Sequence, residues 1–384
     1  MIDTPSLVDQ YCHGVLRAEL GLGTFERQLA PGSAPAAAGT TFFDTQTGFA
    51  VRRWCPPLLG LEPHCPPARY LARRRELGVL ETGRRLLRAS GITTYLVDTG
   101  LPGDLTGPAE LAATGNAAAH EIVRLELLAQ QVADTSGTVD SFLANLAEAV
   151  HGAAAGAVAF TSVAGVRGGL AAVPEPPGPG EVRGAAGRWL ARRAAGTAVD
   201  DPVLLRHLLW VAVGAGRPLQ LHVGDRDPGA LAGFAAATGG LGTDLVLLHE
   251  YPHHRHAARL AGHFPHVYAD LGPVVARTGA RAAAVLAEFL ELAPFGKLLF
   301  SSGARGLPEL HVVAASVFRG ALARVLGEWV GDGAWSRTDA QRVAGLIAEG
   351  NARRVYRLGA AGPYPLTAPG TAGRAWGRRQ PRGR

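Results

Sequence analysis

Short apolar runs of strand length recur eight times along this 384-residue chain, with longer segments between them. Buried parallel strands have this appearance, and the helices that join them repeat their apolar residues about every 3.6 positions. The expected strands are Leu7–Cys12, Ile92–Asp98, Ile122–Leu127, Val158–Val163, Leu219–Val223, Leu245–His249, Val267–Leu271 and Lys297–Ser301. Eight such units predict an α/β fold, a (β/α)8 barrel of the TIM type.

Helical patterns separate most of these runs. They cover Glu181–Arg193, Pro202–Ala215, His254–His263, Gly279–Leu292 and Pro308–Val325. A doubly wound sheet is the alternative architecture. Its glycine-rich dinucleotide fingerprint is missing from the sequence, and so are the P-loop and the GxSxG elbow. The barrel is therefore the preferred fold.

The first connection is unusually long for a barrel. About 75 residues separate the first two strands, and a loop of that length carries its own structure or function. A segment that follows a barrel strand emerges at the catalytic face, so residues 14–91 are expected to form a partly helical, lid-like insertion. Arg52, Arg53 and Trp54 in this segment are candidate substrate-binding residues for a carboxylate. The alternative, favoured about two to one, is a surface loop whose tryptophan fills the lid's own small core.

Composition bounds the remaining possibilities. A hydrophobic content of 47% with 18% charged residues is typical of a globular protein, expected as one barrel over residues 1–360. The Gly/Pro/Arg-rich tail at 361–384 is expected to be disordered. The formal charge of +6 forms no basic stripe interleaved with aromatic residues, which argues against nucleic-acid binding.

Cellular context follows from the cysteines and the apolar stretches. Three unpaired-looking cysteines favour a reducing compartment. The N-terminus does not resemble a signal peptide, and the apolar stretch Leu204–Val213 is too short and too charged to span a bilayer. We expect a cytoplasmic protein without membrane contact that acts on a small-molecule substrate, with a homodimer left open.

Three histidines stand at the carboxyl ends of separate expected strands. They are His13, His222 and His249. Neutral imidazoles at such positions suit zinc, and also manganese or iron, with a coordinated water left to be activated. A single histidine at a strand end is more often a structural residue. Three at one barrel mouth favour a metal site.

Carboxylates at the same expected edge are candidates for a general base. Asp98 and Glu126 end the second and third strands, and Asp225 lies in the loop after His222. The alternatives are local: Asp98 caps the following turn, and Glu126 pairs with Arg124 on the same strand face.

Several short stretches together resemble the amidohydrolase-related family of the metal-dependent hydrolase superfamily. The closest branch is that of the amidohydrolase domain fused to glutamine-synthetase-like enzymes. The resemblance is carried by Val8–Gly14, His222–Gly224, His249–Pro252 with Arg255, Val267–Asp270, Phe300–Ser302 and Asn351–Tyr356. It implies a barrel with one or two divalent metals bound by His13 and His222. His249 would bind a second metal or polarise the substrate, and Arg255 would contact the substrate.

Three positions depart from the family pattern. Tyr11 replaces the first histidine of the HxH motif, Thr161 replaces a lysine, and Gly303 replaces the strand-eight aspartate. The preferred hypothesis is a metal-dependent hydrolase that attacks an amide or related bond of a small anionic substrate. The alternatives are a degenerate barrel that has lost its metal and binds a small ligand or partner, and a metal-dependent decarboxylase.

Overall fold

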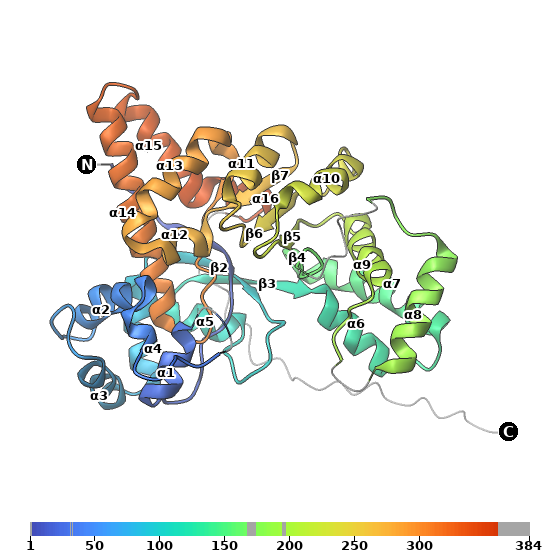
Figure 1. Ribbon diagram of the computed structural model, residues 1–384, viewed down its shortest axis with the longest axis horizontal. Helices are drawn as coiled ribbons and strands as arrows, with labels where there is room; N and C mark the ends of the chain where they lie inside the picture. The colour runs from blue at the N-terminus through green and yellow to red at the C-terminus, as the bar shows by residue number, and fades with distance from the viewer. Residues whose placement is uncertain (1, 31, 33, 167–173, 194–196, 360–384) are drawn as a thin grey trace.

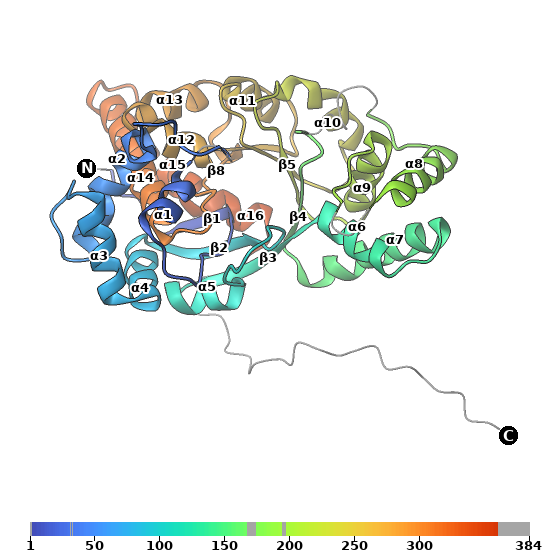
Figure 2. The ribbon, with the colours of Figure 1, turned by 60° about the horizontal axis from the view of Figure 1, so that its bottom comes forward.

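The computed structural model describes residues 2–30, 32, 34–166, 174–193 and 197–359. The tail predicted to be disordered, residues 361–384, lies outside this range. Eight parallel strands form one sheet in which each strand pairs with the next along the chain (Figures 1 and 2). They are β1 (Leu7–Cys12), β2 (Ile92–Asp98), β3 (Ala118–Arg124), β4 (Ala159–Ser162), β5 (Leu219–His222), β6 (Leu245–Leu248), β7 (Val267–Asp270) and β8 (Leu298–Leu299). The predicted (β/α)8 barrel is confirmed.

Backbone hydrogen bonds between β1 and the segment after β8 close the sheet. The amide of Gln10 donates to the carbonyl of Phe300 at 3.1 Å, and the amide of Gly303 donates to the carbonyl of Tyr11 at 3.0 Å. The amide of His13 donates to the carbonyl of Ala304 at 2.8 Å. These bonds bring the two ends of the barrel sequence together at the mouth.

Helices surround the barrel. They are α4 (Val79–Ala89), α5 (Pro108–Gly115), α6 (Leu125–Asp134), α7 (Val139–Gly156), α8 (Pro179–Arg192), α9 (Pro202–Gly214), α10 (Ala232–Thr238), α11 (His254–His263), α12 (Gly272–Thr278), α13 (Ala282–Leu292), α14 (Pro308–Gly331) and α15 (Arg337–Gly345). All five predicted helices are present. The third strand was predicted too far along the chain, because Leu125 and the apolar residues after it belong to the buried face of α6.

The insertion after β1 folds around a small core of its own. It contains α1 (Leu22–Leu29), α2 (Gln46–Leu58) and α3 (Pro67–Leu77), whereas α4 packs with α5 and α14 as part of the helical ring. Phe25, Phe43 and Cys55 are buried in this core together with Val312 of α14. The insertion is therefore anchored to the barrel through one face of α14.

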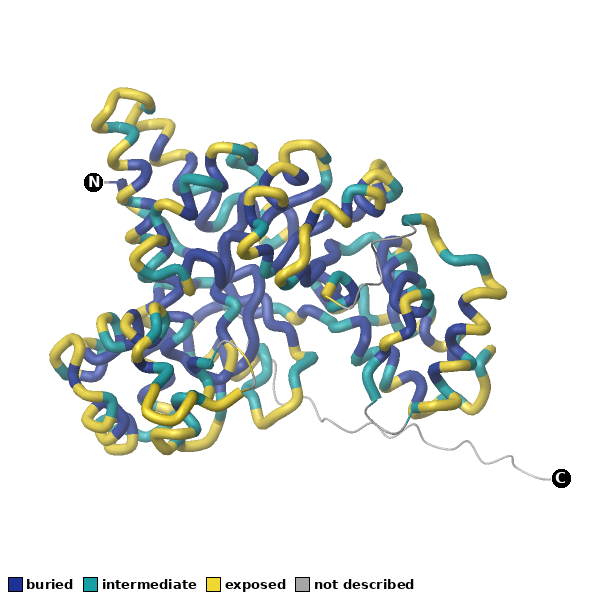
Figure 3. The backbone as a smooth tube through the Cα atoms, in the orientation of Figure 1, coloured by how far each residue is buried: buried dark blue, intermediate teal, exposed yellow. Residues whose placement is uncertain are grey.

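The barrel strands are buried (Figure 3), and apolar side chains of several strands form one cluster inside the barrel. Apolar residues of the strands meet α16 (Asn351–Val355), which together with Tyr356 covers the amino-terminal end of the barrel. The Tyr356 hydroxyl donates to Oε1 of Gln10 at 2.5 Å, and Nε2 of Gln220 donates to the same oxygen at 3.0 Å. The amino-terminal end of the barrel is thus closed to a small molecule.

Among the described helices, α14 has the length and apolar composition of a membrane span, with 56% of its most apolar window buried inside the protein. Its buried residues pack against α2, α4, α12 and α13. Core helices of this kind pass the same test of length and composition.

Candidate functional site

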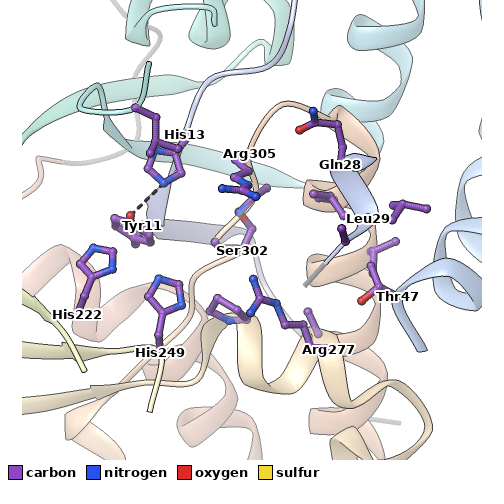
Figure 4. Close-up of a pocket in the computed structure, with 18 of the residues that line it drawn as sticks. Tyr11, His13, Gln28, Leu29, Thr47, His222, His249, Arg277, Ser302 and Arg305 are labelled. Carbon is purple, nitrogen blue, oxygen red and sulfur yellow. Dashed lines mark hydrogen bonds between the residues drawn. The ribbon is translucent and has the colours of Figure 1, made fainter. Parts of the chain in front are cut away.

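A cavity of about 500 Å³ lies at the carboxyl ends of the strands (Figure 4). Its floor includes Tyr11, His13, His222 and His249. The insertion supplies one wall through Gln28, Leu29, Ala30, Thr45, Gln46 and Thr47. The cavity therefore lies at the barrel mouth, as predicted, and the insertion forms part of its wall. Its volume suits a small molecule.

His13 is held in one tautomer by its surroundings. Its Nδ1 lies 2.9 Å from the carbonyl oxygen of Asp98, which can only accept, so Nδ1 carries the proton. Burial lowers the pKa of His13, which keeps the ring neutral at pH 7. Its Nε2 is therefore an acceptor, and the hydroxyl oxygen of Tyr11 lies 3.0 Å from it.

Tyr11 occupies the centre of the three histidines (Figure 4). Its ring meets those of His13, His222 and His249 edge-on, with centroid separations of 5.2, 5.1 and 5.6 Å. Burial, followed by the nearby carboxylate of Asp98, raises the pKa of Tyr11 well above its ordinary value. The side chain is a neutral phenol that donates one hydrogen bond.

His222 and His249 are also neutral. Burial is the main cause that lowers the pKa of His222 well below its ordinary value, and Nε2 of this ring lies 3.2 Å from the hydroxyl of Thr161. Burial and then the charge of Arg277 lower the pKa of His249 to about 3. His249 adopts a left-handed conformation with φ of 63°, and its ring centroid lies 4.9 Å from that of His222.

Asp98 lies beneath the cavity and is fully engaged. Its Oδ2 accepts from the hydroxyl of Tyr11 at 3.1 Å and forms an ion pair with Arg124, while Oδ1 accepts from the amide of Gly100 at 2.8 Å. The predicted turn-capping contact is thus present. Asp98 reaches the cavity only through Tyr11 and Arg124, both of which line it.

Glu126 belongs to α6 and not to the third strand, which corrects its predicted position. Its Oε1 accepts from the hydroxyl of Ser162 at 2.5 Å and from the amide of Val163 at 3.0 Å. The expected ion pair with Arg124 is also wrong, because that guanidinium contacts Asp98 instead. Burial raises the pKa of Glu126, and the residue does not line the cavity.

The four predicted substrate-binding residues lie away from the cavity lining. Nη2 of Arg52 donates to the carbonyl of His64 at 3.4 Å, and the guanidinium of Arg53 lies 4.5 Å from the ring of Trp54. Trp54 packs against the insertion's own core. Arg255 forms exposed ion pairs with two glutamates of α13, at 3.0 Å to Glu291 and 3.6 Å to Glu288.

Two arginines that the sequence did not single out do line the cavity. Arg277 comes from α12 and Arg305 from the loop after β8 (Figure 4). Both residues are exposed overall and line the same cavity, and the pKa of Arg277 is lowered by burial of its guanidinium and then by the charge of Arg305. Within the described ranges, neither forms an ion pair, and no carboxylate lines the cavity. Arg305 could have been identified from the sequence by its position shortly after the eighth strand, because residues there lie at the barrel mouth.

The histidines do not fit a divalent ion in this arrangement. Nε2 of His13 faces the Tyr11 hydroxyl, Nε2 of His222 faces Thr161, and glycine stands at position 303. Among the described residues, three potential ligands come within 4.8 Å of one another at Asp9, Cys12 and His311. Asp9 and Cys12 belong to β1 and His311 to α14. The carboxylate of Asp9 already accepts hydrogen bonds from the amide and the hydroxyl of Ser302.

Comparison with known proteins finds a relative in part of the sequence and relatives in fold. A 153-residue stretch is 37% identical to Protein fluG of Emericella nidulans; it covers 37% of this chain and 18% of that protein. The fold is similar to that of a provisionally assigned metal-dependent hydrolase of Lactobacillus casei, with 23% identity, a TM-score of 0.78, and coverage of 93% of this chain and 96% of the other.

A second structure with a similar fold is uronate isomerase from Thermotoga maritima. The identity is 13% and the TM-score is 0.59, with 93% of this chain and 95% of the other covered. The family model described as amidohydrolase matches residues 86–358, which is more than half of the chain. This chain therefore belongs to the amidohydrolase family.

Proposed function

We propose that the barrel mouth binds a small organic anion through Arg277 and Arg305. The observation that carries the proposal is the presence of these two guanidinium groups, without ion-pair partners among the described residues, in a cavity lined by no carboxylate. The third arginine of the cavity, Arg124, is already compensated by Asp98. Two positive charges are thus left for a ligand.

The energetics favour an anion at this position. Two guanidinium groups that line one cavity repel each other, and an anion between them relieves that repulsion. Guanidinium groups also match the geometry of a carboxylate, to which they can donate two parallel hydrogen bonds. A carboxylate is therefore the ligand group that the cavity suits best.

The remaining lining describes the rest of the ligand. Leu101, Ala276, Leu310 and Val313 supply apolar surface, and the floor presents Tyr11 with neutral imidazoles. Such a lining suits an uncharged body of modest size beneath the anionic group. The ligand would then be a small carboxylic acid with a partly apolar body rather than an extended polymer.

A second candidate function is that of a metal-dependent hydrolase of an amide or related bond. Membership of the amidohydrolase family suggests a metal-dependent enzyme, and three neutral histidines from separate strand ends converge on one point. His13, His222 and His249 would be the ligands, with zinc the first choice of ion. This candidate requires Tyr11 to leave the Nε2 atom of His13.

Calorimetric titration with benzoate, succinate, citrate and inorganic phosphate distinguishes the two candidates. Each titration is run on chelator-treated protein and on protein supplied with zinc. The proposal predicts that at least one carboxylate binds equally well in both preparations. Binding that appears only after zinc is added would contradict it and support the hydrolase, and the absence of binding to any anion would contradict it as well.

A further inference from the structure

We infer that Tyr11 takes the place of a metal ion at the centre of this barrel mouth. In the family to which the chain belongs, side chains from several strands would be joined by a shared ion. Here one tyrosine side chain contacts all three histidines, His13 through its hydroxyl and ring and the other two through its ring. The inference concerns how the mouth is held together and does not depend on the anionic ligand proposed above.

The hydroxyl of Tyr11 contacts groups from three neighbouring strand ends. It lies 3.0 Å from Nε2 of His13 after β1, 3.1 Å from Oδ2 of Asp98 on β2, and 3.4 Å from Nη2 of Arg124 on β3. Arg124 also pairs with Asp98, which completes a closed network. The hydroxyl thus joins the ends of β1, β2 and β3, while the ring of the same side chain contacts His222 of β5 and His249 after β6.

The hydroxyl is not free to leave this network without cost. Nδ1 of His13 donates to the Asp98 carbonyl, so the only lone pair of that ring points at Tyr11. Nε2 is the nitrogen that would bind a metal. The single proton of the phenol is donated to Oδ2 of Asp98, and this buried carboxylate would keep its desolvation penalty if it lost that donor, so the hydroxyl is held in place.

The ring of Tyr11 occupies the space between the imidazoles. The side chain is almost completely buried, and its ring lies about equally far from all three histidine rings. An ion held at ordinary zinc–nitrogen distances of about 2.0–2.1 Å by these histidines would occupy the same volume. The phenol and such an ion are mutually exclusive.

Position 303 gives independent support. Gly303 has φ of +55°, and a Cβ atom there would lie 2.3 Å from Cγ of Pro273, the second residue of α12. The aspartate typical of the family therefore cannot be introduced at this position unless α12 moves. Position 11 is the place where a metal ligand can be restored within the existing backbone.

The substitution Tyr11→His tests the inference, with metal content measured by elemental analysis after incubation with zinc chloride and desalting. We expect about one zinc ion per chain in the variant and less than about a tenth in the wild-type protein, since the variant frees Nε2 of His13 and adds an imidazole. Bound Co²⁺ should show visible absorption in the variant alone. Tyr95→Phe is the matched control, because the Tyr95 hydroxyl is buried without a hydrogen-bond partner.

Two results would overturn the inference. One is stoichiometric zinc in the wild-type protein that disappears in His13→Gln. The other is a folded Tyr11→His protein, verified by circular dichroism, that takes up no zinc or cobalt.

Tyr11→Phe supplies a test that does not depend on the fate of the histidine variant. It keeps the ring and removes the hydroxyl, so we expect no metal uptake and a larger decrease in Tm than Tyr95→Phe produces. An equal decrease in both variants would show that the hydroxyl does not hold the mouth together. Zinc uptake by Tyr11→Phe would show that the ring does not exclude the ion, and either result would contradict the inference.

Discussion

Nε of Arg74 lies 2.9 Å from Oε1 of Glu309, which places a buried ion pair between α3 of the insertion and the first turn of α14. The N–H of that nitrogen is not directed at the oxygen, so the contact is electrostatic rather than a hydrogen bond. The hydroxyl of Tyr70 donates to the same oxygen at 2.8 Å. This carboxylate thus adds a polar contact between the insertion and the barrel beside the apolar core that they share.

Glu309→Ala should lower the free energy of unfolding by about 3–5 kcal/mol, because it leaves the guanidinium of Arg74 buried without its partner. Urea denaturation followed by circular dichroism measures the loss. Glu81→Ala, which removes the exposed ion pairs of Glu81 with Arg84 and Arg85 on α4, is the control and should have little effect. Equal losses in the two variants would show that the buried pair does not anchor the insertion.

Arg277→Gln and Arg305→Gln should each weaken carboxylate binding by about 10- to 100-fold, the usual value of a hydrogen bond to a charged group. Arg255→Gln is the matched control, since Arg255 is exposed and paired with Glu288 and Glu291. Calorimetry at two salt concentrations provides the measurement. A larger loss of carboxylate affinity in Arg255→Gln than in the other two variants would contradict the proposal and place the anion site at Arg255.

Asp98→Asn should have opposite effects on stability and binding. Removing the carboxylate leaves Arg124 without its partner, so the free energy of unfolding should fall by about 3 kcal/mol. The same change adds one uncompensated positive charge to the cavity lining, so carboxylate affinity should rise. Asp140→Asn, at an exposed pair with Arg183, controls for a simple change of net charge. Weaker binding by Asp98→Asn would contradict the electrostatic account of the cavity.

Gly303→Ala should be more destabilising than an alanine at another left-handed glycine. At Gly60, with φ of +80°, a Cβ atom meets nothing within 4 Å, so Gly60→Ala measures backbone strain alone. At position 303 the contact with Pro273 adds about 1–3 kcal/mol of overpacking. Thermal unfolding of both variants measures the difference, and a difference of zero would mean that α12 moves freely.

The stability of the protein should also depend on pH through Asp270. Burial raises the pKa of this carboxyl from 3.8 to about 7. Between these values the folded protein binds more protons than the unfolded chain, so stability falls as pH rises from about 4 to 7. Asp270 lies beside Glu250, whose pKa is also raised by burial and then by the charge of Asp270, so Asp270→Asn removes one of two interacting carboxyls and should reduce the slope in that window. An unchanged slope in urea titrations from pH 4 to 8 would contradict the assignment.

The sequence predicts the barrel well because its signal is local. Apolar runs bounded by polar strand ends are short-range patterns, and the helix His254–His263 matches the prediction at both ends. The third strand is the exception, since only Arg124 separates Ile122 and Val123 of β3 from the apolar residues that begin α6. An apolar run that crosses a strand–helix boundary gives no sign of where the boundary lies, and Glu126 was misplaced for this reason.

The site is only partly predictable because its charges come from distant segments. The three histidines follow strands, so their convergence can be expected from the barrel alone. Arg277 and Arg305 meet only because α12 and the loop after β8 fold over the same cavity. In the sequence these two arginines look like any surface arginine. Arg52, Arg53 and Trp54, by contrast, are consecutive, and this adjacency suggested a substrate-binding cluster. Trp54 in fact packs against the core of the insertion.

The most direct test of the account is a calorimetric titration of chelator-treated protein with the carboxylate that binds best, in wild-type and Arg277→Gln/Arg305→Gln protein. The account predicts one saturable site per chain in the wild type without any added metal and no measurable binding in the double variant. Undiminished binding in the double variant, or wild-type binding that requires zinc, would contradict it.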